Sequence, residues 1–236
     1  MESMEKTTKR KFNGWRILEW CAFIALFIWL LLNILGIRVA TVDGSSMYPN
    51  LVNNEKVTTY HPIWWKFDHH EYQRGQVIIF KANTVDPRYM SNNNIKDSNL
   101  PVYYTKRIIA VPGDTVEFNN NVLYVNGKPV DQSFISHKQA TLGTYGPLSN
   151  NGSPRAERWT LESLADNNTN PIAQWNQYSI KDLKDNKVPN GMYFVMGDNR
   201  AISNDSRYYG FVKDKDIQGV VHATTHDKHK INDIHY

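Results

Sequence analysis

The feature that most constrains this chain is a long apolar run close to its start. From Trp20 to Ile37 every residue is apolar or glycine except Asn33. As a helix these 18 residues would rise about 27 Å, close to the roughly 30 Å hydrocarbon core of a bilayer. Residues 15–19 lengthen the run to a comfortable span. We therefore expect a single transmembrane helix over residues 15–37.

Charges flanking the run predict its orientation. Residues 1–16 contain five basic and two acidic side chains, so they hold +3 of the formal net charge of +4. After the run the first basic residues are Arg38 and then Lys56. Because the more basic flank of a membrane helix stays in the cytoplasm, residues 1–14 are predicted to be a cytoplasmic tail. Residues 38–236 then form an extracytoplasmic domain at the cell membrane.

A cleaved secretory signal is the main alternative to a retained anchor, because it has a similar basic start and apolar stretch. The run is longer than the usual apolar core of such a signal. Cleavage after Ala40 would also place the bulky, charged Arg38 three positions before the cut, where it fits poorly. We therefore favour a retained anchor, and a buried helix of a soluble domain is a weaker third interpretation.

Charge and cysteine content beyond the anchor exclude several classes of function. Residues 17–236 sum to a net charge of only +1, which gives no concentrated basic face for displacing counterions from phosphates. We therefore expect no nucleic-acid partner. The only cysteine, Cys21, lies in the apolar run, so the remaining chain can contain no disulfide, cysteine-ligated metal cluster or cysteine nucleophile.

After the anchor, short runs of β-branched, aromatic and aliphatic residues alternate with turn signals such as Pro112-Gly113-Asp114 and Asn126-Gly127. Strands are predicted at 56–60, 76–81, 102–111, 115–118, 122–125, 128–130, 192–196 and 219–223. The pattern indicates a mainly β fold of antiparallel sheets. Residues from about 120 to 190 include a long polar stretch, predicted to be an inserted non-catalytic part with one short helix at Leu161–Ala165.

Two residues in this domain have the chemistry of a nucleophile and its base. Ser46 follows the membrane exit by a few residues, although a serine in such a segment is by itself more often a turn or cap residue. Lys106 lies in the apolar stretch Val102–Ile109. Burial on a strand would lower the pKa of its amine and leave a neutral base near pH 8. The alternative is a lysine that extends from an edge strand into water. None of the eight histidines lies in a motif that pairs with Ser46.

Four segments carry a family resemblance. They are Ser46–Pro49, Arg74–Phe80, Lys106-Arg107 leading to Pro112-Gly113-Asp114, and Gly197–Arg207. In this order they resemble the conserved boxes of type I signal peptidases, and the single anchor resembles the shorter, Gram-positive type. The resemblance implies an antiparallel β-sheet signal-peptidase-like catalytic domain. It also implies a serine endopeptidase that cleaves signal peptides from exported preproteins after small residues (Ala-x-Ala), without metal or cofactor.

The resemblance assigns roles to particular residues. Ser46 would be the nucleophile, with its backbone N–H facing the oxyanion, and Lys106 would be the general base. Ser203 would donate a hydrogen bond that orients the lysine. The supporting residues would be the Asp205 and Arg207 ion pair beneath the site and the turn Asp198, Asn199 and Arg200. Substrate-pocket or strand-pairing residues would be Val42, Leu51, Tyr104 and Thr105, although Val42 and Leu51 fit a plain core role equally well.

Three positions depart from the family pattern. Gly44 stands where some members supply a side-chain hydroxyl to the oxyanion, Gln76 where aspartate is common and Asn50 where threonine is common. Because both Ser46 and Lys106 are present, we interpret these differences as tuning of the site rather than loss of activity.

The implied partners are signal peptides of exported preproteins and the lipid bilayer, with the secretion machinery nearby. Trp64 and Trp65 would either dip into the outer leaflet or pack in the core. The His222, His226 and His229 run is interpreted as a solvated tail rather than a metal site. Two rival functions remain: a self-cleaving repressor peptidase, which would need a DNA-binding domain in place of the anchor, and a catalytically idle assembly factor on this fold.

Overall fold

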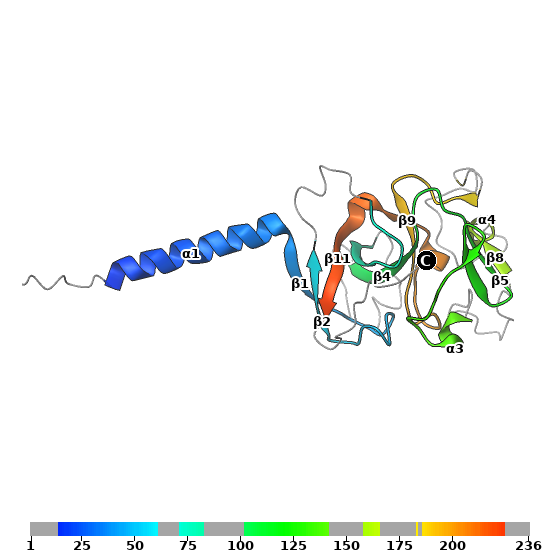
Figure 1. Ribbon diagram of the computed structural model, residues 1–236, viewed down its shortest axis with the longest axis horizontal. Helices are drawn as coiled ribbons and strands as arrows, with labels where there is room; N and C mark the ends of the chain where they lie inside the picture. Colours follow the sequence, from blue (N-terminus) through cyan, green and yellow to red (C-terminus); the bar gives the residue numbers. More distant parts are fainter. Residues whose placement is uncertain are drawn as a thin grey trace, which may run out of the picture.

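The computed structural model describes residues 14–60, 71–82, 102–141, 158–165, 183 and 186–224. One long helix projects from a β-rich body, and the chain passes directly from the helix into that body (Figure 1). The predictions made for residues 1–13, for Trp64 and Trp65, and for His226 and His229 lie outside the described residues.

Helix α1 (Gly14–Leu35) is apolar from Trp20 onwards except for Asn33, and none of its residues is buried. It is long and apolar enough to cross a membrane. The side chain of Asn33, the polar residue near its end, donates to the Trp29 carbonyl at 2.8 Å, so its amide is satisfied within the helix. Gly36 adopts a positive φ of 66°. The helix therefore ends two residues before the predicted limit, and Ile37 begins a strand.

A seven-stranded antiparallel sheet forms the larger part of the body, with strand order β1-β2-β11-β3-β4-β9-β10. Its strands are β1 (Ile37–Thr41), β2 (Lys56–Tyr60), β3 (Val77–Lys81), β4 (Tyr103–Ala110), β9 (Met192–Met196), β10 (Val212–Lys213) and β11 (Ile217–Thr224). Irregular registers interrupt the pairing of β11 with both neighbours and of β4 with β9. Such irregularities bend strands, and β1 lies at the edge of the sheet.

A second sheet of four strands has the order β7-β6-β5-β8. It consists of β5 (Val116–Asn119), β6 (Val122–Val125), β7 (Lys128–Pro129) and β8 (Arg158–Thr160), and it is accompanied by the short helices α3 (His137–Ala140) and α4 (Leu161–Ala165). Its inner side chains, among them the stacked pair Phe118 and Trp159, form one buried cluster with Phe194 and Met196 of β9. The two sheets therefore share a core along β9.

Strand β4 sits near the middle of the large sheet, between β3 and β9. Successive side chains of a strand point to opposite faces. Ile108 accordingly joins a cluster with Ile78 and Val195, whereas Ile109 joins the cluster under the second sheet. By the same alternation Lys106 and Arg107 leave β4 on opposite faces, which places two buried cations in different surroundings.

The prediction of a mainly antiparallel β fold is confirmed. The predicted strands agree with the structure to within two residues at each end, and the helix at Leu161–Ala165 is confirmed. Three short strands were missed: β1, β8 and β10. Two further short elements, α5 (Ser206–Tyr209) and a 3-10 turn at Asp214–Asp216, complete the described body. β1 begins at Ile37, a residue that continues the apolar run and that the predicted anchor includes.

Candidate active site

Ser46 lies in the loop that joins β1 to β2. Short backbone contacts fold this loop: the Val42 N–H donates to the Glu55 carbonyl at 2.8 Å, and the Leu51 N–H donates to the Met47 carbonyl at 3.0 Å. Met47 and Leu51 are buried and pack into a hydrophobic cluster, which attaches the loop to the core. The loop therefore holds Ser46 in a defined position.

Lys106 meets Ser46 from β4. Its side chain is only 4% exposed, and its Nζ donates to Ser46 Oγ at 2.6 Å. Burial lowers the pKa of the Lys106 amine to about 8, although the negative charges of Asp205 and Asp198 act to raise this pKa. At pH 8 about half of the amines are therefore neutral. The lysine points into the protein, as expected from its apolar strand, and does not extend into water.

Aromatic rings lie beside the lysine amine. The Tyr104 ring centroid lies 5.5 Å from Lys106 Nζ. Phe80 and Tyr209 pack against Tyr104. The centroid of each of these two rings lies 6.2 Å from the centroid of the Tyr104 ring. These apolar surfaces exclude water from the amine, which is the physical cause of its lowered pKa.

Gly197 brings the segment after β9 directly behind the nucleophile. A β-carbon at this position would lie 2.2 Å from Ser203 Oγ and 2.5 Å from the Ser46 carbonyl oxygen. No side chain fits there without movement of the neighbours. Only a glycine allows the turn to approach Ser46 this closely. Gly197 belongs to a box noted in the sequence, but its role in spacing was not predicted.

Asn199 continues this turn and holds the nucleophile loop by two bonds. Its backbone N–H donates to the Ser46 carbonyl at 3.0 Å. Its side-chain Nδ2 donates to the Ser45 carbonyl at 3.2 Å. Of the predicted supporting turn, Asn199 is therefore the residue in direct contact with the nucleophile segment.

Ser203 is buried beside Gly197 and the Ser46 carbonyl. Among the described residues its hydroxyl makes no hydrogen bond of standard geometry, although it lies near enough to Asp205 to help lower the pKa of that carboxyl. The bond to Lys106 that the resemblance implies is not formed in this structure. Ser203 lies beside the Ser46 carbonyl, and its role in orienting Lys106 stays a prediction.

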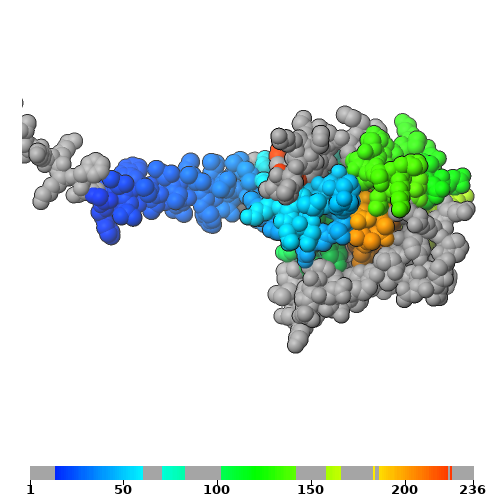
Figure 2. All heavy atoms as spheres, turned by 90° about the horizontal axis from the view of Figure 1, so that it is seen from below, coloured from blue at the N-terminus to red at the C-terminus, as the bar shows by residue number. Residues whose placement is uncertain are grey.

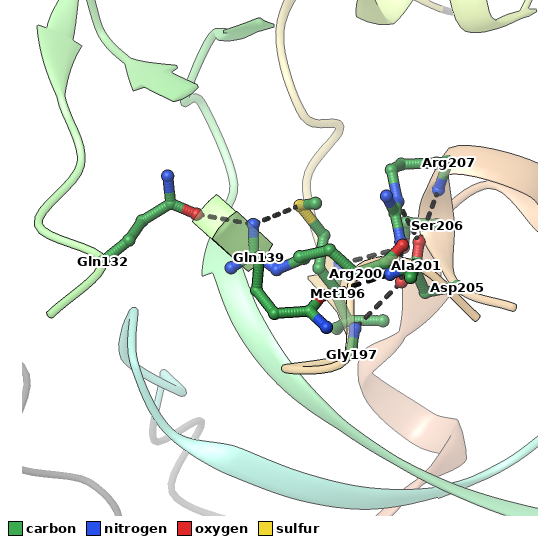
Figure 3. A network of polar contacts seen from close by, with 10 residues as sticks. Gln132, Gln139, Met196, Gly197, Arg200, Ala201, Asp205, Ser206 and Arg207 are labelled. Atoms are coloured by element: carbon green, nitrogen blue, oxygen red, sulfur yellow. Dashed lines mark hydrogen bonds and ion pairs between the residues drawn. The ribbon is translucent and has the colours of Figure 1, made fainter. Parts of the chain in front are cut away.

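Asp205 and Arg207 form a fully buried ion pair. Arg207 Nε and its terminal NH2 donate to the two carboxylate oxygens, each at 2.8 Å, and both side chains are 0% exposed. Burial would raise the pKa of Asp205, but the charge and hydrogen bonds of Arg207 outweigh it and the pKa lies below its usual value. The Gly197 N–H donates to the same carboxylate at 2.9 Å. The pair thus supports the turn behind Ser46 (Figure 3).

A second buried ion pair, Arg107 with Asp198, was not predicted. Arg107 donates to the Asp198 carboxylate at 2.8 and 2.6 Å and to the Gly75 carbonyl at 2.7 Å. Asn50 Nδ2 also donates to Asp198, at 2.8 Å. The available signal was an arginine next to Lys106 on an apolar strand, because a buried arginine requires a counter-charge.

Arg200 is buried on the other side of this turn. Its NH1 donates to Gln132 Oε1 at 2.6 Å and approaches the Met196 sulfur at 3.8 Å. Figure 3 shows Arg200 reaching from the turn towards Gln132, while Asp205 and Arg207 pair on the opposite side. Arg200 therefore links the turn to the segment that follows the second sheet.

A groove of about 370 Å³ opens beside the dyad. Its walls are the end of β1 with the following loop, the first half of β4, and three single residues: Ile79, Ile202 and Asn204. β1 and β4 are separated by three other strands in the sheet order, so the sheet must curl to bring both to one groove. In Figure 2 the light-blue surface of residues around 40–60 lies between α1 and the green residues of the second sheet.

The predicted pocket residues divide into two groups. Val42, Tyr104 and Thr105 line the groove. Leu51 is fully buried among Val42, Met47 and other core residues and does not reach the groove. Its position corresponds to the plain core role that the sequence left open.

Nothing in the described part of the chain groups three or more histidine, cysteine or acidic side chains in a way that could hold a metal ion. His222 is exposed at the surface.

Comparisons with known proteins identify the family of the chain. The family described as Signal peptidase, peptidase S26 matches residues 15–225. Signal peptidase IB of Staphylococcus aureus (strain COL) is 33% identical over 214 residues, covering 87% of each chain. Signal peptidase I S of Bacillus subtilis (strain 168) is 32% identical over 218 residues, covering 91% of this chain and 90% of its own. A crystal structure of a signal peptidase I from Enterococcus faecalis V583 aligns with a TM-score of 0.41 at 29% identity, covering 64% of this chain and 97% of that chain. The chain therefore belongs to the signal peptidase family, peptidase S26, and is a hydrolase of the type I signal peptidase class.

Proposed function

We propose that this chain is a membrane-anchored serine endopeptidase that removes signal peptides from exported preproteins, with Ser46 as nucleophile and Lys106 as general base. The observation that carries the proposal is the 2.6 Å contact between a buried lysine amine and the Ser46 hydroxyl at the edge of a groove. An amine that is neutral near pH 8 can accept the serine proton, whereas an ordinary surface lysine cannot.

The reaction follows from this geometry. Neutral Lys106 takes the proton of Ser46 as Oγ attacks the scissile carbonyl, and it delivers that proton to the leaving amine, so that an ester to Ser46 remains. Water then attacks the ester, with the same amine as base. None of the described residues accepts from the Ser46 backbone N–H, so this donor is available for the developing oxyanion. Gly44 offers no side-chain donor there.

The two ion pairs explain how a lysine can stay neutral with two carboxylates nearby. Lowering the pKa of Lys106 from 10.5 to about 8 disfavours its charged form by about 3 kcal/mol. Unpaired, Asp198 and Asp205 would favour the charged amine. Arg107 and Arg207 neutralise these carboxylates, so desolvation remains the larger influence on Lys106.

The groove suits an extended peptide. β1 is the edge strand of the large sheet and runs into the groove, so an extended substrate can pair with its backbone. Side chains one and three positions before the cut then point to the same face. We propose that the walls near Val42, Tyr104 and Thr105 admit only small residues at these two positions, which gives Ala-x-Ala cleavage.

We propose that the anchor holds this groove close to the membrane. Ser46 lies only ten residues after Gly36, where the helix ends. We propose that residues 1–14 lie in the cytoplasm and residues 38–236 outside, with the bilayer and the nearby secretion machinery as partners and residues of about 120–190 as the non-catalytic insert. An active site held this close to the bilayer can bind signal peptides that are themselves held in the bilayer.

The full-length protein in detergent, incubated with a preprotein, tests the proposal. Mass spectrometry should locate one cut after an Ala-x-Ala sequence. We expect Ser46→Ala and Lys106→Ala each to lower the rate by at least about 10⁴-fold while the unfolding transition is retained. Ser45→Ala, which removes the hydroxyl next to the nucleophile, is the matched control and should keep the rate within about 2-fold. Substantial cleavage by Ser46→Ala or Lys106→Ala would contradict the dyad.

A further inference from the structure

The segment from Gln132 to Gln139, which follows β7 of the second sheet, reaches across to the active-site turn. The Phe134 carbonyl accepts from Asn50 Nδ2 at 2.9 Å. The Arg107 guanidinium carbon lies over the Phe134 ring, 4.4 Å from the centroid of that ring. Gln132 accepts from Arg200, as described above. The segment thus contacts the nucleophile loop at Asn50, strand β4 at Arg107 and the turn after β9 at Arg200.

Gln139 contacts Ala201 and Asn199, and Asn199 binds the Ser45 and Ser46 carbonyls. Its Oε1 accepts from the Ala201 backbone N–H at 3.3 Å, and its Nε2 donates to Asn199 Oδ1 at 3.1 Å. Figure 3 shows its side chain directed at the turn that carries Ala201 and Arg200. Asn199 Nδ2 in turn donates to the Ser45 carbonyl. Two amides therefore connect Ala201 to the residue before Ser46.

The direction of these bonds is fixed at both ends. A backbone N–H only donates, so it must meet the Oε1 of Gln139 and leave Nε2 facing Asn199. Asn199 must then present Oδ1 to Gln139 and Nδ2 to the Ser45 carbonyl, which only accepts. Gln139 Nε2 and the Ser45 carbonyl therefore select the same orientation of the Asn199 amide, and Gln139 supports it through Oδ1.

We propose that Gln139 is a positioning residue for the nucleophile. It orients the Asn199 amide, and through it the Ser45-Ser46 backbone, relative to Lys106. The proposal rests on the proposed function of Ser46. Gln139 lies outside the boxes that carry the family resemblance and within the insert of about residues 120–190, so it adds a positioning role but no reacting group to that insert. The segment is itself well held, because Ser136 caps helix α3 by accepting from the Gln139 N–H at 3.3 Å and Ile135 is buried.

Two variants of Gln139 test this inference on the full-length enzyme. Gln139→Ala removes both side-chain bonds, and we expect kcat to fall about 10-fold with KM within about 2-fold, because the substrate groove is untouched. Gln139→Glu keeps the bond from Ala201 but presents a second acceptor to Asn199, which favours the wrong amide orientation. Its kcat should fall further, by about 30-fold or more. Lys138→Ala, an exposed neighbour in the same helix, is the control.

A double-mutant cycle shows whether Gln139 acts through Asn199. If it does, Gln139→Ala combined with Asn199→Ala should lower kcat no more, within about 2-fold, than Asn199→Ala alone. Multiplicative losses in the double variant would overturn the inference. It would equally be overturned if both Gln139 variants kept the kcat of Lys138→Ala, or if their losses disappeared after correction for the folded fraction measured by thermal unfolding.

The same experiment separates this inference from the proposed function. If Ser46→Ala abolishes cleavage and the Gln139 variants do not alter kcat, only the role of Gln139 fails. If Ser46→Ala still cleaves, the dyad fails whatever the Gln139 variants do.

Discussion

The surroundings of Ser46 and the core beneath the second sheet are built in opposite ways. Eight of the eleven buried polar or charged residues in the described structure come from β4 or from the segment that runs from β9 into α5: Lys106, Arg107, Asp198, Arg200, Ser203, Asp205, Ser206 and Arg207. The cluster beneath the second sheet is apolar throughout, with Phe118, Leu123 and Trp159 among its members. Burying charges costs free energy that apolar packing does not. The first region is therefore shaped by the chemistry of the site, and the second supplies stability.

Asp205→Asn should produce the largest effect, because it leaves Arg207 buried without its counter-charge. We expect a loss of about 3–5 kcal/mol in the free energy of unfolding, measured by denaturant titration of the full-length protein in detergent. Since Asp205 raises the pKa of Lys106, its removal should also move the pH midpoint of any remaining activity downwards. Glu162→Gln, an exposed carboxylate in the second-sheet region, should change stability by less than about 0.5 kcal/mol. Equal stabilities for the two variants would contradict the buried-pair account.

Phe118→Ala tests the apolar half of the comparison. The ring is 2% exposed and stacks on Trp159, so its truncation should cost about 3–4 kcal/mol of stability. Below its unfolding transition the variant should retain kcat within about 2-fold, because the second-sheet core does not touch the dyad. A large loss of kcat in fully folded protein would show that the two regions are not separable.

Gly197→Ala should affect chemistry more than stability. The added methyl group would lie 2.5 Å from the Ser46 carbonyl oxygen, which Asn199 holds from behind. A displacement of the nucleophile by a fraction of an ångström should lower kcat about 100-fold while KM changes little. Gly14→Ala, where nothing lies within 4 Å of the added atom, is the control. Kinetics of Gly197→Ala that match those of Gly14→Ala would refute the close-packing argument.

Lys106→Met should increase stability even though it abolishes cleavage. The folded protein lowers the pKa of this amine, so the unfolded chain binds its proton more tightly between about pH 8 and 10.5. The loss of folding stability that comes from burying the charged amine is therefore fully present below pH 8. It disappears as the pH rises from about 8 to 10.5. At pH 7 we expect Lys106→Met to unfold with a free energy about 2 kcal/mol higher than the parent. The gain should shrink towards pH 10; a variant less stable than the parent at pH 7 would contradict this.

The sequence predicted local features well and long-range partners poorly. The strands followed from alternation and turn residues, and an inward Lys106 followed from the apolar run around it. Arg107 and Asp198 lie 91 residues apart, and Gln139 and Asn199 lie 60 apart, so neither pairing leaves a local pattern. Leu51 was indistinguishable from a pocket residue until the fold placed it in the core. The resemblance supplied the site residues, but the contacts between them required the structure.

The pH dependence of kcat/KM for a soluble signal-peptide substrate is the most direct test of the central claim that Lys106 acts as a neutral base. The ratio reports groups titrating in the free enzyme. It should rise tenfold per pH unit at low pH and level off with a midpoint near 8, the pKa to which burial lowers the Lys106 amine. A profile that is flat through pH 8, or one that rises only towards the ordinary lysine value of 10.5, would contradict the account.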